Sequence, residues 1–355
     1  MEKTNDERLK IVRNARRLLR FLEQKREKMS PLLIVTHDYP DPDSLASAVA
    51  LQYIAEQGFG IQSRVVYGGI IGRTENKGMV QILKLPVHKL RSRDFKSYQH
   101  TALVDTQPEF ENNPYPKNRK PTLIIDQHAS LRKPSAELAI VDTECGATCV
   151  ILSRALLLMK REIPARIATA LAYGIVSDTL NLYRAPHPHV IDTYLDILPY
   201  CDMRALARIQ NPSRSRKFFS TLGRGIQNAT SRRRLVVSHL GAVETPDLVS
   251  QVADFLLTYK GTCYTCCTGR FRGKLHVSLR TSIPGVEAGE VLRDVFLSRG
   301  EAGGHGAIAG GSFEVGEGVD SEIWDQLEQG LTESLARRLR IPKKAEADYP
   351  FRIKE

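Results

Sequence analysis

Seven aspartate and histidine residues are spaced so that they could share one divalent-metal site. Three of them follow a single apolar run in an HxxxDxD pattern, and the others follow further apolar runs; they are His37, Asp41, Asp43, Asp105, Asp126, His128 and Asp178. Crowded carboxylates oppose each other's ionisation unless cations neutralise them. A mixed Asp/His set suits Mn²⁺ or a similar ion, and two such ions can activate water and stabilise a phosphoryl transition state. A lone aspartate after a strand is usually a turn former, so the metal hypothesis depends on the whole set.

Alternating apolar runs and helical patterns are expected to bring these residues to one edge of a sheet. Strand-like runs cover 31–36, 61–67, 101–104, 122–125 and 138–141, and helical patterns cover 44–57, 74–84, 146–161 and 165–177. This alternation predicts an α/β fold, a mostly parallel sheet with helices on both faces. Ligands of such sheets bind beyond the carboxyl ends of the strands, which is where the acids fall.

The chain after residue 190 predicts a linker and then a smaller α+β domain. Residues 191–233 are basic and loosely patterned, with nine Lys/Arg and no acid between Arg204 and Arg234. A basic run suits a polyanionic partner, and a solvated helix face is the alternative of equal weight. Residues 234–340 combine a hairpin turning at 270–273, helices near 287–299 and 320–339, and a glycine-rich stretch. Strands grouped with helices in this way indicate α+β architecture.

The two ends of the chain complete the expected organisation. An amphipathic helix at 3–28 occupies the segment 1–30, and residues 341–355 form a charged tail. The net charge is +11, and no apolar run approaches the roughly 20 residues that span a bilayer. The N-terminus is charged and has no apolar signal core. We therefore expect a cytoplasmic protein without a membrane partner.

Five motifs, in order along the chain, resemble those of the DHH phosphoesterase family. They are HDYPDPDSLASA at 37–48, VDT at 104–106, DQH at 126–128, SDT at 177–179 and GGHGAIAGG at 303–311. Each motif is weak alone, but the ordered set covers most of the chain. The resemblance makes 31–190 the catalytic domain and 234–340 the DHH-associated substrate-binding domain, with the active site between them.

The resemblance also implies a role for each residue of the motifs. His37 and Asp41 would hold one metal ion, Asp43 and Asp178 would help to hold another, and Asp105 would bridge the two. His128 would contact the scissile phosphate and serve as a general acid. The substrate would be gripped in the second domain by Arg280, Gly303, Gly304 and His305. One or two divalent ions, with Mn²⁺ favoured, and a short oligonucleotide, dinucleotide or 3′-phosphorylated nucleotide substrate are the expected cofactor and partner; a homodimer is left open.

One position departs from the family pattern. Gln127 stands where the family has the first histidine of its triplet, and a glutamine oxygen is a weaker ligand for Mn²⁺ than an imidazole nitrogen. An enzyme is still the favoured interpretation because every acidic ligand is present. Gln127 motivates one alternative, a nucleotide-binding module with little or no activity. The basic run motivates another, a single-strand exonuclease.

Overall fold

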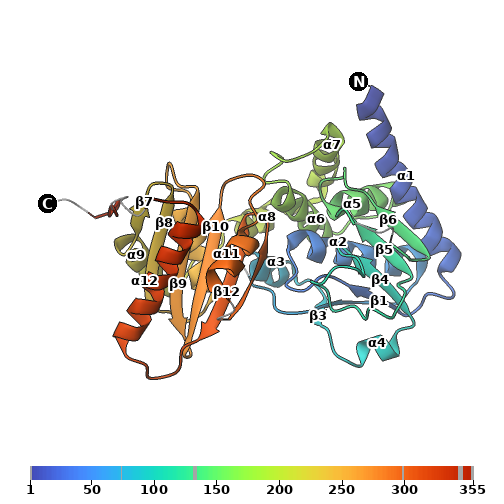
Figure 1. Cartoon of the computed structure of the whole chain (residues 1–355). Coiled ribbons are helices and arrows are strands. Elements are labelled where there is room, and N and C mark those ends of the chain that lie inside the picture. Colours follow the sequence, from blue (N-terminus) through green and yellow to red (C-terminus); the bar gives the residue numbers. More distant parts are fainter. Residues whose placement is uncertain (1, 73, 131–133, 298–299, 343–346, 353–355) are drawn as a thin grey trace. The chain divides into compact units, whose positions relative to one another are not determined.

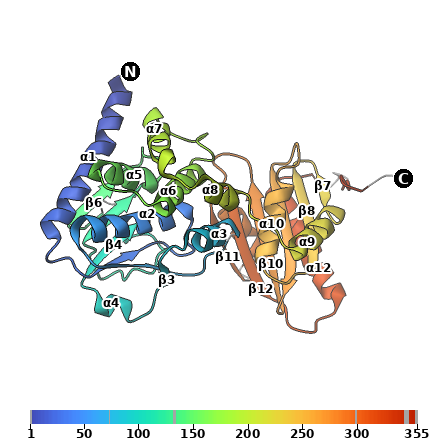
Figure 2. The same ribbon diagram turned by 180° about the vertical axis from the view of Figure 1, so that it is seen from behind.

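The computed structural model of the chain describes residues 2–72, 74–130, 134–297, 300–342 and 347–352 (Figures 1 and 2). It divides into two compact units, Met1–Ser213 and Arg214–Glu355. The first is an α/β unit around a six-stranded sheet and the second is a smaller α+β unit, which confirms the fold class that the sequence predicts. No helix in these described ranges combines the length and the apolarity that crossing a bilayer requires.

All six strands of the first sheet run parallel, in the order β3-β2-β1-β4-β5-β6. They are β1 (Leu32–Val35), β2 (Ser63–Tyr67), β3 (Val87–Lys89), β4 (His100–Val104), β5 (Leu123–Asp126) and β6 (Leu138–Val141). The central strand β1 is buried along its whole length, as expected for a strand covered on both faces. The order changes direction beside β1, so β1 and β4 border the point where ligands of such sheets bind.

Helices cover the two faces of this sheet unequally. Successive strand residues point to opposite faces: Leu32 and Ile34 join the large core under the long helices, while Leu33 and Val35 join a smaller core with Tyr115. The helices of the unit are α1 (Glu2–Lys25), α2 (Pro42–Tyr53) with a π-turn at Ile54–Gly58, α3 (Thr74–Leu83), α4 (Asp94–Ser97), α5 (Thr148–Met159), α6 (Ala165–Asp178), α7 (Pro188–Ile197) with a 3₁₀ turn at Leu198–Tyr200, and α8 (Met203–Gln210). The N-terminal helix α1 contributes Leu18 to the large core.

The range 191–233, which the sequence predicts to be a linker, is mostly helical. It holds most of α7, all of α8, and α9 (Arg216–Gln227), and the two units divide within it at 213/214. Few apolar residues are needed to fix such helices: in α8, Leu206 and Ile209 are buried while the basic side chains stay outside. The basic composition of this segment suggested a linker, whereas the spacing of its few apolar residues is that of amphipathic helices.

The sheet of the second unit has the order β11-β12-β10-β9-β8-β7. Its strands are β7 (Thr230–Arg232), β8 (Leu235–Ala242), β9 (Tyr264–Phe271), β10 (Lys274–Thr281), β11 (Glu301–His305) and β12 (Ile308–Glu314). Its helices besides α9 are α10 (Asp247–Leu256), α11 (Ala288–Phe296) and α12 (Ser321–Arg338). The β9–β10 hairpin turns at Arg272 and Gly273, both with positive φ, inside the predicted range 270–273.

Gly174 gives a test of how α6 fixes the start of α2. A Cβ placed on Gly174 would lie 2.5 Å from Cys149 Sγ and 3.2 Å from Asp43 Cα. We expect Gly174→Ala to destabilise the first unit by about 1–3 kcal/mol, because the core there has no room for the methyl group. Urea unfolding followed by far-UV circular dichroism measures the change.

The matched control is Gly78→Ala in α3, where a Cβ would meet nothing within 4 Å. It should stabilise the helix by roughly 0.5–1 kcal/mol. The single tryptophan, Trp324, lies in α12 of the second unit, so its fluorescence transition should stay unchanged in both variants. An unshifted dichroism transition in Gly174→Ala would contradict the tight contact.

Candidate metal centre

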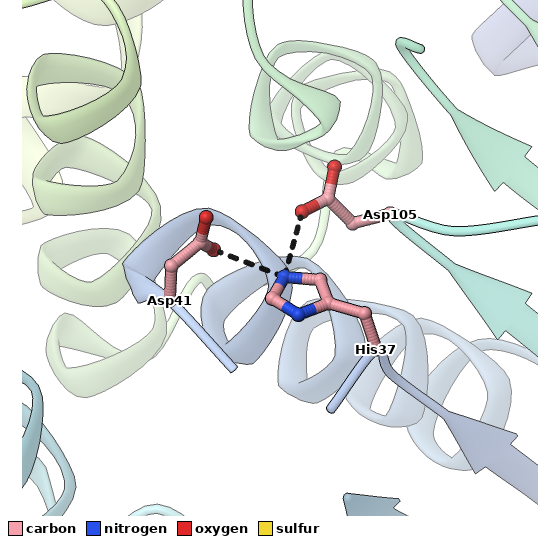
Figure 3. A group of neighbouring side chains, drawn as sticks. All are labelled: His37, Asp41 and Asp105. Carbon is pink, nitrogen blue, oxygen red and sulfur yellow. Dashed lines mark ion pairs between the residues drawn. The ribbon is translucent and has the colours of Figure 1, made fainter. Parts of the chain in front are cut away.

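His37, Asp41 and Asp105 form a compact group at the carboxyl end of β1. The Nε2 atom of His37 lies 3.7 Å from Asp41 Oδ1 and 3.7 Å from Asp105 Oδ2 (Figure 3). One ligand atom from each residue lies within 4.8 Å of the other two. His37 Nδ1 donates to the Asp38 carbonyl oxygen at 2.7 Å, so loss of the other ring proton would leave the Nε2 lone pair free to bind a cation lying between the two acids.

Local backbone geometry places the two acids of this group. Asp41 is the N-cap of α2, and its Oδ1 accepts a hydrogen bond from Ser44 N at 2.9 Å. Asp105 follows β4 in the left-handed region, at φ 59°, a conformation that aspartate tolerates better than most residues. Its Oδ1 accepts a hydrogen bond of 2.8 Å from the Thr148 hydroxyl. The acids are therefore oriented by the helix and strand ends that carry them.

Asp43 is fully buried against the first turn of α5. Its Oδ1 accepts from Cys149 N and its Oδ2 from Thr148 N, both at 2.7 Å, and Ser47 Oγ donates to Oδ1 at 3.3 Å. A carboxylate at a helix N-terminus satisfies amides that lack a partner within the helix. The same acid that the motif assigned to a metal therefore also caps a core helix.

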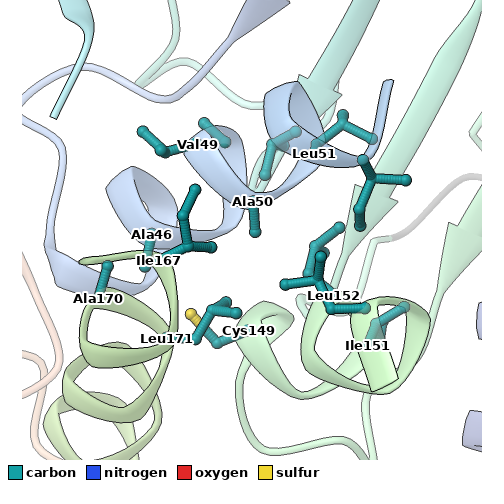
Figure 4. Close-up of a cluster of buried hydrophobic side chains, with 14 of the residues drawn as sticks. Ala46, Val49, Ala50, Leu51, Cys149, Ile151, Leu152, Ile167, Ala170 and Leu171 are labelled. Carbon is teal, nitrogen blue, oxygen red and sulfur yellow. The ribbon is translucent and has the colours of Figure 1, made fainter. Parts of the chain in front are cut away.

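The helices that carry these acids are fixed by a common core. Ala46 and Ala50 of α2, Leu152 of α5, and Ile167 and Leu171 of α6 are all buried and belong to one cluster (Figure 4). Because α2 carries Asp43, α6 carries Asp178 and α5 supplies the amides that hold Asp43, small changes of packing among these helices would move the carboxylates.

Asp178 and Gln127 approach Asp43 from two further elements. Asp178 ends α6, and Gln127 follows β5 directly. Gln127 Nε2 donates to Asp178 Oδ2 at 2.5 Å and to Asp43 Oδ2 at 3.3 Å. The structure thus brings all the metal-site residues predicted from the motifs into one region of the first unit.

His128 is held by an acid and an amide that the motif assignment left without a role. Its Nδ1 lies 2.9 Å from Asp126 Oδ1, while Gln107 Nε2 donates to Asp126 Oδ2 at 2.6 Å and to the His128 carbonyl oxygen at 2.8 Å. Half of the His128 side chain is exposed. Asp126 therefore fixes the ring with Nε2 directed away from it. No sequence signal marks Gln107, whereas Asp126 could have been assigned from its place beside His128.

Burial and crowding shift the pKa values of the site. Burial, reinforced by the charges of neighbouring acids, raises the pKa of Asp105 well above its usual range and that of Asp178 to about 8. For His37, burial lowers the pKa, but the hydrogen bond and charge of Asp41 outweigh it and raise the pKa to about 9. For His128, the hydrogen bond to Asp126 outweighs burial and raises the pKa. Such a site holds excess protons that a cation would displace.

The donor chemistry of the first group fits a divalent ion. One imidazole nitrogen and two carboxylate oxygens converge there, and the opposite ring nitrogen is already bound to a backbone carbonyl, the arrangement that orients histidine ligands. On the other side, Asp43 and Asp178 are bridged by the Gln127 amide. Thr148 and Cys149, which hold Asp43, were missed by the sequence analysis because backbone amides carry no motif.

The residues predicted to bind substrate in the second unit lie on two different strands. Gly303 and Gly304 are exposed in β11, and His305 ends that strand, although its side chain lies outside the described part of the chain. A Cβ at Gly304 would lie 2.2 Å from Ile308 O, so this hairpin requires glycine there. The glycine-rich stretch is thus a β-hairpin rather than a loop.

Arg280 is buried in β10 with its guanidinium already engaged. Its Nε donates to Asp254 Oδ1 at 2.5 Å, and its Nη1 donates to the carbonyl oxygens of Leu279 and Ala309 at 3.0 and 3.1 Å. These bonds give Arg280 a structural role in the sheet, and its predicted contact with substrate stays a prediction.

Comparisons with known families match both units. The model of the DHH family, N-terminal domain, matches residues 31–175, and the DHHA1 domain matches residues 233–333. An uncharacterized protein of Methanocaldococcus jannaschii, MJ1633, is 31% identical over 307 residues, which cover 86% of this chain and 63% of that protein. A protein of Streptococcus pyogenes serotype M5 named "Probable manganese-dependent inorganic pyrophosphatase" is 25% identical over 165 residues, 46% of this chain and 53% of that protein.

The chain spans less than two thirds of the length of either of these curated relatives. Among solved structures, an exopolyphosphatase-related protein from Bacteroides fragilis superimposes with a TM-score of 0.67 at 15% identity, covering 91% of this chain and 98% of that one. At this identity the likeness shows the shared fold.

The raised pKa values predict how the metal-free protein responds to pH. Folding raises the pKa of Asp178 from its ordinary value of 3.8 to about 8, and that of His37 from 6.5 to about 9. Between these pKa values each group is protonated in the folded state and deprotonated in the unfolded state. The folded state then holds more protons than the unfolded state, so stability should fall as the pH rises from about 4 to about 9. Melting temperatures in excess chelator measure this fall.

Asp178→Asn should flatten the part of this fall that lies below about pH 8, because the amide does not titrate. Asp196→Asn, which changes an acid paired with Arg154 at the surface, serves as the control and should keep the wild-type profile. Metal-free protein that gained stability over this interval would contradict the assignment.

Proposed function

The chain belongs to the DHH family, with a DHHA1 domain as its second domain, and from this premise we propose that it is a divalent-metal-dependent phosphoesterase. The observation that carries the proposal is the convergence of His37, Asp41 and Asp105 on a volume that one ion would fill. Asp105 is buried and Asp41 is partly exposed, and acids this close to each other oppose joint ionisation unless a cation neutralises them. The relative named a probable manganese-dependent pyrophosphatase supports Mn²⁺ as the favoured ion.

Within this proposal the residues of the first unit divide into holding and reacting groups. His37, Asp41 and Asp105 would hold the ion, which when bound lowers the pKa of water and polarises a phosphoryl oxygen. His128 has its Nδ1 bound to Asp126, so its Nε2 would meet the phosphate or protonate the leaving oxygen. The raised pKa of His128 suits it to carry that proton near neutral pH.

The substrate class that we propose is a short phosphodiester or a 3′-phosphorylated nucleotide, bound with help from the second unit. Gly303 and Gly304 are exposed in the hairpin and carry no side chain, so phosphate oxygens could approach the backbone there closely. His305 is the proposed side-chain contact beside them. Aromatic platforms that long single strands stack upon are sparse in a chain with one tryptophan, which favours short substrates over an exonuclease.

A nucleotide-binding module of low activity is the second candidate, and one observation favours it. Gln127 hydrogen-bonds to Asp43 and Asp178, the two acids proposed to hold a second ion. Fast hydrolysis by the wild-type protein would exclude this candidate, whereas tight nucleotide binding without turnover would support it.

Asp105→Asn tests the proposed chemistry with little change of shape, since asparagine also tolerates a positive φ. We expect the purified wild-type protein with Mn²⁺ to hydrolyse a model dinucleotide and the variant to lose more than about 100-fold in kcat/KM, because a metal ligand loses its charge. Asp196→Asn should retain wild-type activity. Absence of turnover with Mn²⁺, Mg²⁺ and Co²⁺, or equal activity of Asp105→Asn, would count against the proposal.

A series of substrates of increasing length tests the substrate class. If the site accepts short phosphodiesters, kcat/KM should fall by about tenfold or more beyond a few nucleotides, because the additional nucleotides would gain too little stacking to offset the cost of ordering them. Initial rates on end-labelled oligonucleotides measure the trend. Rates that rise with length would instead support the single-strand exonuclease.

A further inference from the structure

Gln127 has the geometry of a donor to two carboxylates. Its Nε2 carries two hydrogens, and this nitrogen lies 2.5 Å from Asp178 Oδ2 and 3.3 Å from Asp43 Oδ2. The two acids come from different helices, and Gln127 comes from the end of β5. A single neutral amide therefore joins three elements where two acids would otherwise face each other.

Asp43 has no acceptor capacity to spare in this arrangement. A carboxylate offers about four acceptor positions. The amides of Thr148 and Cys149, the hydroxyl of Ser47 and the amide of Gln127 supply four donors to Asp43. Three of these donors belong to fixed helical turns, so an ion bound by Asp43 must displace Gln127.

The neighbouring acids also fix the orientation of the Gln127 amide. When both acids are ionised, an exchange of the amide oxygen and nitrogen would place the oxygen against two carboxylate oxygens, which would repel it. A histidine at this position could present a nitrogen lone pair to a metal ion, whereas the bonded glutamine presents N–H groups. Gln127 therefore directs the partial positive charge of its N–H groups at the two acids and offers no lone pair to a cation.

We propose that the Gln127 amide takes the place of a second metal ion, so that this chain binds one divalent ion tightly, at His37, Asp41 and Asp105. The inference rests on the proposed metal-dependent function and deepens it. At the first group, His37 Nε2 and the acids Asp41 and Asp105 face one another directly. The bridge by Gln127 is confined to Asp43 and Asp178.

Counting ions per chain tests this inference without measuring activity. The full chain is stripped with chelator, dialysed against Mn²⁺ at concentrations from about 1 to about 100 μM, and assayed by elemental analysis. Wild type should bind one ion per chain over this range, and Gln127→His should bind two. Gln52→His introduces the same side chain near the other end of α2, where the glutamine bonds to Glu56 and Ser63 O and has no hydrogen bond to Asp43 or Asp178, and this variant should bind one ion.

Thermal melting in chelator gives a second test, which stays valid even if Gln127→His fails to fold. Gln127→Ala leaves the two acids without their shared donor, so its melting temperature without metal should fall by about 2–4 °C relative to wild type. Excess Mn²⁺ should raise the melting temperature of this variant by more than it raises that of the wild type, because in the variant an ion can also bind beside Asp43 and Asp178.

Two outcomes overturn the inference: two tightly bound ions in the wild-type chain, or a single ion in a folded Gln127→His. These are separate from failure of the proposed function. A wild-type count of one together with no hydrolysis of any phosphoester would reject the enzyme and keep the one-ion site, while hydrolysis with a count of two would reject the one-ion site and keep the enzyme.

Discussion

Mutual repulsion among carboxylates buried at the strand ends is the constraint on which the rest of the first unit depends. Asp43, Asp105 and Asp126 are almost fully buried, and each must be neutralised or hydrogen-bonded. The chain meets this demand with backbone amides of α5, the Thr148 hydroxyl and the Gln107 amide. Only part of the demand is left for a cation. The geometry of the site is therefore as much a product of protein donors as of any ion.

This division of labour explains why the two sides of the site differ. On one side, an imidazole and two acids face one another across gaps of 3.7 Å, and an ion would bring them together. On the other side, Gln127 already joins Asp43 and Asp178. The amide at position 127 supplies hydrogen-bond donors to these two acids, while the helices around it are held by one apolar cluster.

The sequence predicted the sheet, the two-unit organisation and the set of strand-end acids because each rests on a local signal. Apolar runs mark β1 and β4, and the HxxxDxD spacing places Asp41 and Asp43 on one helix start. The sequence could not predict the partners of these acids. Gln107 reaches Asp126 across 19 positions and Thr148 reaches Asp43 across 105, and such pairs exist only once the chain is folded. The helices within 191–233 were missed because a few buried apolar residues suffice to dock them.

The placement of Asp43 on the first turn of α5 has a consequence for dynamics. The amides of Thr148 and Cys149 are sealed by a side chain that belongs to the site, not by the preceding loop. Opening of that helix end and loss of the site geometry are then a single event. Hydrogen–deuterium exchange at these two amides would occur only through this event. Whatever binds at the site therefore sets how often the first turn of α5 opens.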